Sequence, residues 1–395
     1  MAIVRTKGGC GCAIAALVAV LVALGFVGYK YILPWWNKRP PEPSGKELRV
    51  YVLDVGQGDS ILIISPEGKT VLVDAGDEKH GKQIVEALKS KGVQDHLDYF
   101  VATHSHPDHI GGVPEVFAAF KVGTVLHNDF PPPEVVKASE AESAAAQGGN
   151  KKQGKPKPPP PPRGRGGRVV ELPTVKAYNG FKGAAEQAGA QFKKAEPEQK
   201  IELGGGAILT VLAPQPPPFT REQISSSRSG NESNANSIVM RLDYGDFSML
   251  LTGDAEAQTE DRLVNKELDE LKDVDVLKVA HHGSKYATTE NFLKRVRPKA
   301  AVISMSEFNR YGHPSQDVLN RLKAAGVTEL FRTDLQGEIS ITTTGKVKDG
   351  KLYEIKAAKE TKTDLWLGRE GEKNDSSSSG FIAYGDYGPP PKRRK

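Results

Sequence analysis

The stretch Thr103-His104-Ser105-His106-Pro107-Asp108-His109-Ile110-Gly111-Gly112 places three histidines and one aspartate within six residues. It directly follows residues 97–102, an apolar run that predicts a buried strand. Imidazole and carboxylate groups are good ligands for zinc or manganese, and side chains in a loop at a strand end can converge. A polar loop without a ligand role is the alternative, but the whole chain has nine histidines. The stretch therefore predicts a metal site.

The pattern on both sides of this motif predicts two similar halves. Each half begins with short β-rich segments separated by turn residues and ends with alternating strands and helices. Strands are expected at 48–55, 60–64, 70–74, 97–102, 124–126, 200–203, 208–212, 237–242, 247–251, 274–279, 300–304, 330–333 and 338–342. Helices are expected at 82–91, 113–120, 255–264, 288–296 and 316–325. This order predicts an α/β fold, a four-layer αββα sandwich in which two packed sheets have helices outside.

Composition divides the rest of the chain. Residues 34–46 are a linker, 47–345 form the folded domain, and 346–395 become a polar, serine-rich, basic tail. Residues 131–168 carry proline runs and no apolar periodicity, which predicts a disordered insert inside the domain.

The N-terminus carries an apolar run without a charged residue from Gly8 to Tyr29. Residues 1–12 form its flank. Residues 13–33 predict a membrane span that is slightly short but acceptable in length. Trp35, Trp36 and the following basic residues fit a bilayer interface. A cleaved secretory signal is the rival. Because no small-residue cleavage site follows, we expect a single-pass anchor in the cell membrane.

Charge is unevenly distributed along the chain. The net charge is +5, yet residues 151–168 hold seven basic residues and no acid, and the last four residues are all basic. The remainder is therefore mildly acidic. The two basic strips suit nucleic acid or anionic lipid, although solvated linker and tail is the interpretation that composition favours. Both cysteines, Cys10 and Cys12, lie at the N-terminal edge of the apolar run, which excludes a thiolate metal site from the folded domain.

Two further polar motifs also follow predicted strands. The first is Leu251-Thr252-Gly253-Asp254, and the second is Ala280-His281-His282-Gly283-Ser284. By itself Asp254 would be a turn or helix-capping residue. The order of the three motifs instead favours one shared site.

The HxHxDH pattern resembles the signature of the metallo-β-lactamase fold. The resemblance implies two divalent metal ions, Zn or Mn. It assigns His104 and His106 to the first ion, and Asp108 and His109 to the second. Asp254 would bridge the two ions, since one carboxylate can span metals about 3.5–4 Å apart. His282 would complete the second ion's ligands, with His281 as the alternative.

A narrower resemblance links the chain to the hydrolase domain of the ComEC competence proteins. It rests on LDVGQGDS at 53–60, VDAG at 73–76, Asn236-Ser237, HHGS at 281–284 and RYGHP at 310–314. The resemblance runs from about residue 48 to 343. ComEC proteins have many membrane spans and this chain has one candidate span, so only the hydrolase part is carried over. Many relatives give the first ion a third histidine, but no histidine lies between His127 and His281.

The resemblance implies a phosphodiesterase or nuclease that acts on single-stranded DNA through a water activated by two metals. It also implies that the hydrolase domain faces outside the cytoplasm. One alternative is a hydrolase of esters, lactones or lactams on the same fold. Another is a membrane-anchored nucleic-acid-binding protein without catalytic activity.

Further polar residues are candidates for supporting roles. We expect Asp54, Asp59 and Asp74 to orient the ligands from behind, with turn capping as the alternative. Asn236, Ser237 and Ser284 are candidate phosphate contacts. His313 is a candidate substrate contact or proton donor, and together with Asp108 and Asp254 it completes the expected catalytic set.

The anchor is tested by exchanging Leu17 and Leu21 for arginine in the full chain. Each arginine near the middle of a span costs about 2.5–3.5 kcal/mol of insertion free energy. We expect the wild-type chain to stay in the membrane pellet after an alkaline wash and the double variant to be released. Equal retention of both chains would contradict the anchor.

Overall fold

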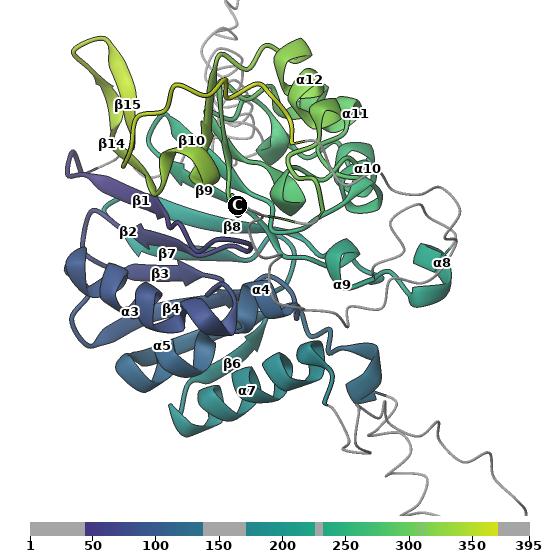
Figure 1. The fold of residues 1–395 in the computed structure, drawn as a ribbon. Coiled ribbons are helices and arrows are strands. Elements are labelled where there is room, and N and C mark those ends of the chain that lie inside the picture. The colour runs from purple at the N-terminus through teal and green to yellow at the C-terminus, as the bar shows by residue number, and fades with distance from the viewer. Residues whose placement is uncertain (1–43, 137–170, 226–231, 308, 310, 370–395) are drawn as a thin grey trace, which may run out of the picture. The chain divides into compact units, whose positions relative to one another are not determined.

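The computed structural model describes residues 44–136, 171–225, 232–307, 309 and 311–369 (Figure 1). Among these residues no helix is both long and apolar enough to cross a bilayer. The expected anchor at 13–33 and residues 137–168 of the expected insert lie outside the described ranges. Residues 133–136, at the start of that insert, are helical.

The first sheet has eight strands and is built mainly from the N-terminal half. Across the sheet they are β15 (Lys351–Ala357), β14 (Ile339–Lys348), β1 (Leu48–Val52), β2 (Ile61–Ile64), β3 (Thr70–Val73), β4 (His96–Ala102), β5 (Lys121–His127) and β6 (Gln191–Lys194). From β15 to β3 neighbouring strands pair antiparallel, and from β3 to β6 they pair parallel.

The second sheet has seven strands and repeats this plan. They are β13 (Glu329–Arg332), β12 (Ala300–Ile303), β11 (Val276–Lys278), β10 (Phe247–Leu251), β9 (Val239–Tyr244), β8 (Ala207–Ala213) and β7 (Lys200–Gly204). The strands from β7 to β10 pair antiparallel, and those from β10 to β13 pair parallel. The two halves predicted from the sequence are thus confirmed.

Helices cover the outer face of each sheet (Figure 1). Those on the first sheet are α3 (Gly81–Ser90), α5 (Val113–Ala119) and α7 (Pro173–Gln187). Those on the second sheet are α10 (Ala257–Asn265), α11 (Glu290–Val296) and α12 (Gln316–Ala324). Short helical turns complete the domain: η2 (Glu78–His80), α4 (Pro107–Ile110), α8 (Arg221–Ser225), α9 (Glu232–Ala235), η3 (Asp269–Leu271), η4 (Ala280–Gly283) and α13 (Thr333–Gln336).

Strand β2 shows how the sequence makes this four-layer arrangement. All four of its residues are apolar and buried. Because side chains alternate along a strand, Ile61 and Ile63 enter the core between the sheets, while Leu62 and Ile64 pack under the outer helices. A strand that is apolar on both faces requires a layer on each side. The αββα sandwich is therefore confirmed.

The structure adds elements that periodicity did not reveal. α7 and β6 follow the insert, and α4 lies inside the histidine-rich stretch that was expected to be a loop. The predicted tail boundary at residue 346 is wrong, because β14 continues to Lys348 and β15 pairs with it. Composition did not reveal β15 because it is an outer strand in which charged residues alternate with Tyr353, Ile355 and Ala357, which pack against the core.

The segment after β15 is also fixed to the domain. Arg332 at the end of β13 is buried and donates to the carbonyl oxygens of Leu365 and Leu367, at 3.1 and 2.7 Å. Its charge is balanced by the buried carboxylate of Asp334 at 2.8 Å, which also pairs with Arg369 at 2.6 Å. Residues 358–369 thus belong to the folded domain.

Replacing Asp334 by asparagine tests this buried charge cluster. The change leaves the Arg332 guanidinium buried without its carboxylate, so we expect a loss of about 3–5 kcal/mol in the free energy of unfolding. Urea titration of the full chain measures it. The control is Glu354→Gln, which removes an exposed pair with Lys356 and should leave the urea midpoint unchanged. If both variants unfolded at the same urea concentration, the proposed role of the cluster would be wrong.

Candidate metal centre

Three loops, each following a central strand, bring buried histidines and aspartates together. His104, His106, Asp108 and His109 follow β4 of the first sheet, whereas Asp254 follows β10 and His282 follows β11 of the second. All six side chains are buried. The centre therefore lies where the ends of strands from both sheets meet.

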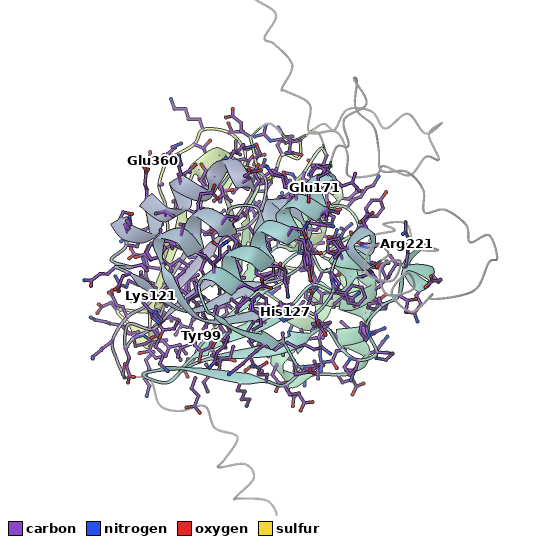
Figure 2. The ribbon with its side chains drawn as sticks, turned by 90° about the horizontal axis from the view of Figure 1, so that it is seen from below. Tyr99, Lys121, His127, Glu171, Arg221 and Glu360 are labelled. Atoms are coloured by element: carbon purple, nitrogen blue, oxygen red, sulfur yellow. The ribbon has the colours of Figure 1, made fainter. Side chains whose placement is uncertain are left out.

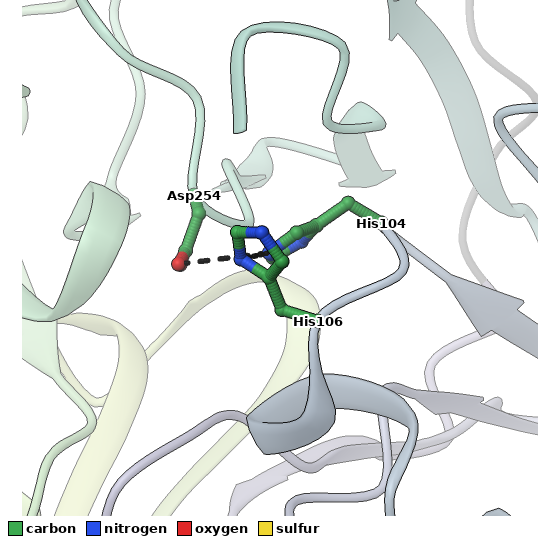
Figure 3. A group of neighbouring side chains, drawn as sticks. All are labelled: His104, His106 and Asp254. Carbon is green, nitrogen blue, oxygen red and sulfur yellow. Dashed lines mark hydrogen bonds and ion pairs between the residues drawn. The ribbon is translucent and has the colours of Figure 1, made fainter. Parts of the chain in front are cut away.

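The first ligand group consists of His104, His106 and Asp254 (Figure 3). Nε2 of His104 lies 2.9 Å from Nδ1 of His106 and 3.8 Å from Oδ2 of Asp254. Three ligand atoms at such separations surround a space that suits a single divalent cation.

The second group consists of Asp108, His109 and His282. Nε2 of His282 lies 3.6 Å from Oδ2 of Asp108 and 3.5 Å from Oδ1 of Asp254. Nε2 of His109 lies 3.3 Å from Oδ2 of Asp254. Oδ1 of Asp254 thus faces His282, and Oδ2 lies near both His104 and His109, so the carboxylate contacts both groups, as one shared by two ions would.

Hydrogen bonds behind these histidines decide which ring nitrogen faces the centre. Nδ1 of His282 lies 2.9 Å from the Ser304 carbonyl oxygen, which can only accept, so Nδ1 carries the proton and Nε2 is left for a ligand role. Nδ1 of His109 likewise meets the Asp74 carboxylate at 2.7 Å. Partners of this kind orient metal-binding imidazoles.

Asp74 also reaches His104 through a hydroxyl. The Thr103 hydroxyl donates to Asp74 at 2.7 Å, so its oxygen is available to accept from Nδ1 of His104 at 3.1 Å. The Thr103 backbone N–H donates to the other Asp74 oxygen at 2.8 Å. One buried carboxylate therefore orients a histidine of each group, which supports the orienting role expected for Asp74.

Asp59 has a partner that the sequence did not indicate. Lys278 of β11 is fully buried, and its ammonium group lies 2.9 Å from Oδ2 of Asp59, while Oδ1 lies 3.6 Å from Nδ1 of His282. The pair joins the loop before β2 to a strand of the other sheet. The neighbouring Gly58 lets this loop approach the ligand loop closely, since its φ is +121° and a Cβ there would overlap the Asp108 carbonyl oxygen.

Buried polar atoms without hydrogen bonds show that the residues fit divalent cations. Among the described residues these include Oδ1 of Asp108, Nε2 of His109, Oδ1 of Asp254 and Nε2 of His282. Leaving several such atoms buried is costly, and a cation between them satisfies all of them at once. The donor set of imidazole and carboxylate is one that zinc or manganese accepts.

Protonation supports the same interpretation. Burial lowers the pKa of His106 to about 4, and it lowers that of His104 well below its usual value, so both rings are neutral at neutral pH. Burial alone would also lower the pKa of His109, but Asp254 and Asp74 raise it well above its ordinary value. A bound cation would take the place of that proton, because a histidine ligand must be neutral.

The choice between His281 and His282 depends on the backbone. Both residues have left-handed φ, 47° and 54°, so the strand does not continue its alternation through them. His282 turns inward and joins the second group. His281 remains 15% exposed; its Nδ1 pairs with Glu256 at 3.0 Å, and its Nε2 lies 3.7 Å from Oδ2 of Asp254. The structure thus places His282 where the sequence resemblance assigned it, and His281 beside the bridging carboxylate.

Some predicted supporting residues have other partners. The Asn236 amide bonds to the backbone of Phe219 and Glu232, which assigns it to loop anchoring instead of phosphate contact. Ser284 accepts from the Tyr286 N–H at 3.4 Å, and Asp54 from the Gly56 N–H at 3.5 Å, both within turns. For Asp54 the alternative of turn capping is therefore favoured.

Ser237, His313 and His127 differ in their relation to the centre. The Ser237 hydroxyl is buried without a hydrogen bond to a described residue, so it stays a candidate contact. His313 packs its ring against His281 at 5.5 Å and therefore lines the centre. His127, at the end of β5 and labelled in Figure 2, instead contacts Phe192, with ring centroids 5.3 Å apart.

Comparison with known proteins agrees with this centre. Residues 53–181 match the family model of the metallo-beta-lactamase superfamily. The chain therefore carries a metallo-β-lactamase domain, a metal-dependent hydrolase fold. It is 28% identical to ComE operon protein 3 of Bacillus subtilis over 78% of this chain and 34% of the relative. It is 29% identical to Competence protein ComA of Neisseria gonorrhoeae over 81% of this chain and 35% of the relative.

These homologues confirm the resemblance to the ComEC family. The chain spans about a third of the length of the curated relatives it matches. Among solved structures, a putative metal-dependent hydrolase from Parabacteroides distasonis is 13% identical, with a TM-score of 0.38, over 75% of this chain and 98% of that one.

The buried pair of Lys278 and Asp59 is tested by replacing Lys278 with methionine. The change leaves the Asp59 carboxylate buried and uncompensated, so we expect a loss of about 3–5 kcal/mol in unfolding free energy, measured by urea titration in EDTA. Adding Asp59→Asn should recover more than half of it.

The matched control is Lys294→Met, because Lys294 also pairs with a carboxylate, Glu290 at 2.6 Å, but both side chains are exposed. This control should lose less than about 1 kcal/mol. Equal losses in Lys278→Met and Lys294→Met would mean that the buried pair does not support the centre.

Proposed function

We propose that this chain is a metal-dependent phosphodiesterase that cleaves single-stranded DNA. The observation that carries the proposal is the pair of buried ligand groups that share the Asp254 carboxylate. The choice of DNA as the substrate rests on the names of the relatives. They are called ComE operon protein 3, Competence protein ComA and Recombination protein 2.

Each residue of the centre has a proposed role. His104, His106 and Asp254 would hold one ion, and Asp108, His109, His282 and the second oxygen of Asp254 would hold the other. Such a pair of divalent ions supplies Lewis acidity toward a phosphoryl group and toward water. Asp74 and Asp59 keep the imidazoles in their orientation.

His281 and His313 line the centre beside the shared carboxylate. Asp254 and Glu256 raise the pKa of His281 to about 9 against the opposing effect of burial. Nδ1 of His313 is buried without a hydrogen bond to a described residue. Burial, together with His281 and His282, holds the pKa of His313 well below its ordinary value, so we assign the neutral ring to substrate contact instead of proton delivery to the leaving group.

Two other functions compete with this proposal. The same fold hosts hydrolysis of esters, lactones and lactams, so the fold by itself does not select phosphodiesters. A nucleic-acid-binding protein without catalysis would need no complete ligand set. The intact set of six ligands is the reason for preferring an enzyme. We retain the proposals that residues 13–33 hold the chain in the membrane and that the domain faces outside the cytoplasm.

The test uses the full chain with Mn²⁺ or Zn²⁺ and a labelled single-stranded oligonucleotide. We expect cleavage that EDTA abolishes, and a loss of at least ~100-fold in Asp108→Ala/His109→Ala, because losing even a residue that supports a ligand typically costs about 10- to 100-fold in metal affinity or activity, and this variant removes two ligands. Bound metal is measured in parallel, and should fall in the double variant.

The matched control is His96→Ala, which removes a half-exposed histidine at the start of β4, away from the ligand groups. It should keep full activity and metal content. A chain that binds metal but leaves DNA intact would end the nuclease proposal, and ester, lactone and lactam substrates would be tested next. A chain that binds DNA without metal and without cleavage would favour the non-catalytic alternative.

A further inference from the structure

Three aromatic rings lead from the surface to the metal centre. The Tyr311 ring stacks on the His313 ring, with centroids 5.7 Å apart and an interplanar angle of 29°. The His313 ring meets the His281 ring edge-on at 5.5 Å. Nε2 of His281 lies 3.7 Å from Oδ2 of Asp254. Tyr311 is thus two ring contacts away from a side chain that touches the shared carboxylate.

Tyr311 is unusually exposed for a large apolar side chain. In the described part of the chain, the exposed large hydrophobic residues are Val136, Tyr311, Val347 and Leu367, so Tyr311 is the one aromatic ring among them. It keeps 40% of its surface in contact with solvent. An exposed aromatic ring beside a catalytic centre is a typical contact for a flat ligand.

Hydrogen bonds fix the backbone of His313, the residue on which the Tyr311 ring stacks. The Asn309 side chain donates to the His313 carbonyl oxygen at 2.7 Å and accepts from the His313 N–H at 2.9 Å. The Ser315 N–H donates to the Gly283 carbonyl oxygen at 2.9 Å, and the Arg369 N–H to the Pro314 carbonyl oxygen at 3.1 Å. The loop is therefore tied to the histidine turn and to the C-terminal segment.

Close packing supports these hydrogen bonds. A Cβ at Gly283 would lie 2.7 Å from Cβ of Pro314, so the loop and the turn that carries His282 fit together only with glycine at this position. A ring that is fixed before binding loses little conformational entropy when a ligand stacks on it. The His313 ring that supports Tyr311 is thus fixed beside the centre before a ligand binds.

We infer that Tyr311 is a stacking platform for a nucleobase next to the phosphodiester that enters the metal centre. The inference rests on the proposed function and adds the way in which the strand is recognised. Aromatic stacking on a base tolerates any sequence, because every base has a π-face. Bases in a duplex are already stacked on their neighbours, so this contact favours single strands.

The test compares two substrates of equal length and charge, oligo(dT) and the same sugar–phosphate chain without bases. In the full chain, Tyr311→Ala should bind and cleave oligo(dT) less well by about 5- to 150-fold, the range for loss of one base stack. The abasic chain should be bound and cleaved equally by wild type and variant.

Two matched variants separate stacking from bulk and from hydrogen bonding. Tyr311→Phe keeps the ring without the hydroxyl and should behave as wild type. Tyr311→Leu keeps apolar volume without a flat face and should resemble Tyr311→Ala. Metal content and the thermal midpoint are measured for every variant, since Tyr311→Ala should change neither.

Several results would overturn the inference. Unchanged affinity for oligo(dT) in Tyr311→Ala would remove the stacking role, and equal loss on the abasic chain would assign Tyr311 to shaping the loop. If the wild type cleaves neither substrate, the proposed function fails. Fluorescence anisotropy with the two strands then still decides whether Tyr311 binds bases.

Discussion

The centre depends on one buried carboxylate that is shared by both halves of the molecule. Asp254 comes from the second sheet, while three of the histidines around it come from the loop after β4 of the first. Burial by itself would raise the pKa of Asp254, but His109, His282 and His281 hold it well below the usual range. A carboxylate kept charged in the interior needs positive charge nearby, and the loops of both sheets are arranged to provide it.

Charges behind the ligands extend this arrangement into the core. Asp74 supports His109 directly and His104 through Thr103. Asp59 approaches His282 and is balanced by Lys278 from the other sheet. Each of these carboxylates is buried and paired, so the orientation of the ligands is coupled to the packing of the sandwich. The centre and the contact between the sheets therefore stabilise each other.

The C-terminal segment connects fold and function in a second way. Two of its carbonyl oxygens accept hydrogen bonds from the Arg332 side chain. The Arg369 N–H donates to the carbonyl oxygen of Pro314, next to His313. A segment that composition assigns to a polar tail therefore supports the loop that carries His313. Directional bonds of buried guanidinium and carboxylate groups fix the segment, together with the packing of Leu365 and Trp366 against the core of the second sheet.

The sequence by itself predicted the four-layer sandwich and the positions of most strands, and its resemblance to a known family supplied the six candidate ligands. Alternating and fully apolar runs are local signals, and a metal site at strand ends needs its ligands in a few short motifs. Only the tertiary structure decided that His282 and not His281 turns inward, because two consecutive left-handed residues interrupt the strand alternation. It alone assigned Asn236 to the backbone of its own loop and gave Asp59 its partner Lys278. Those choices depend on contacts between residues far apart in the chain, and short sequence patterns do not carry that information.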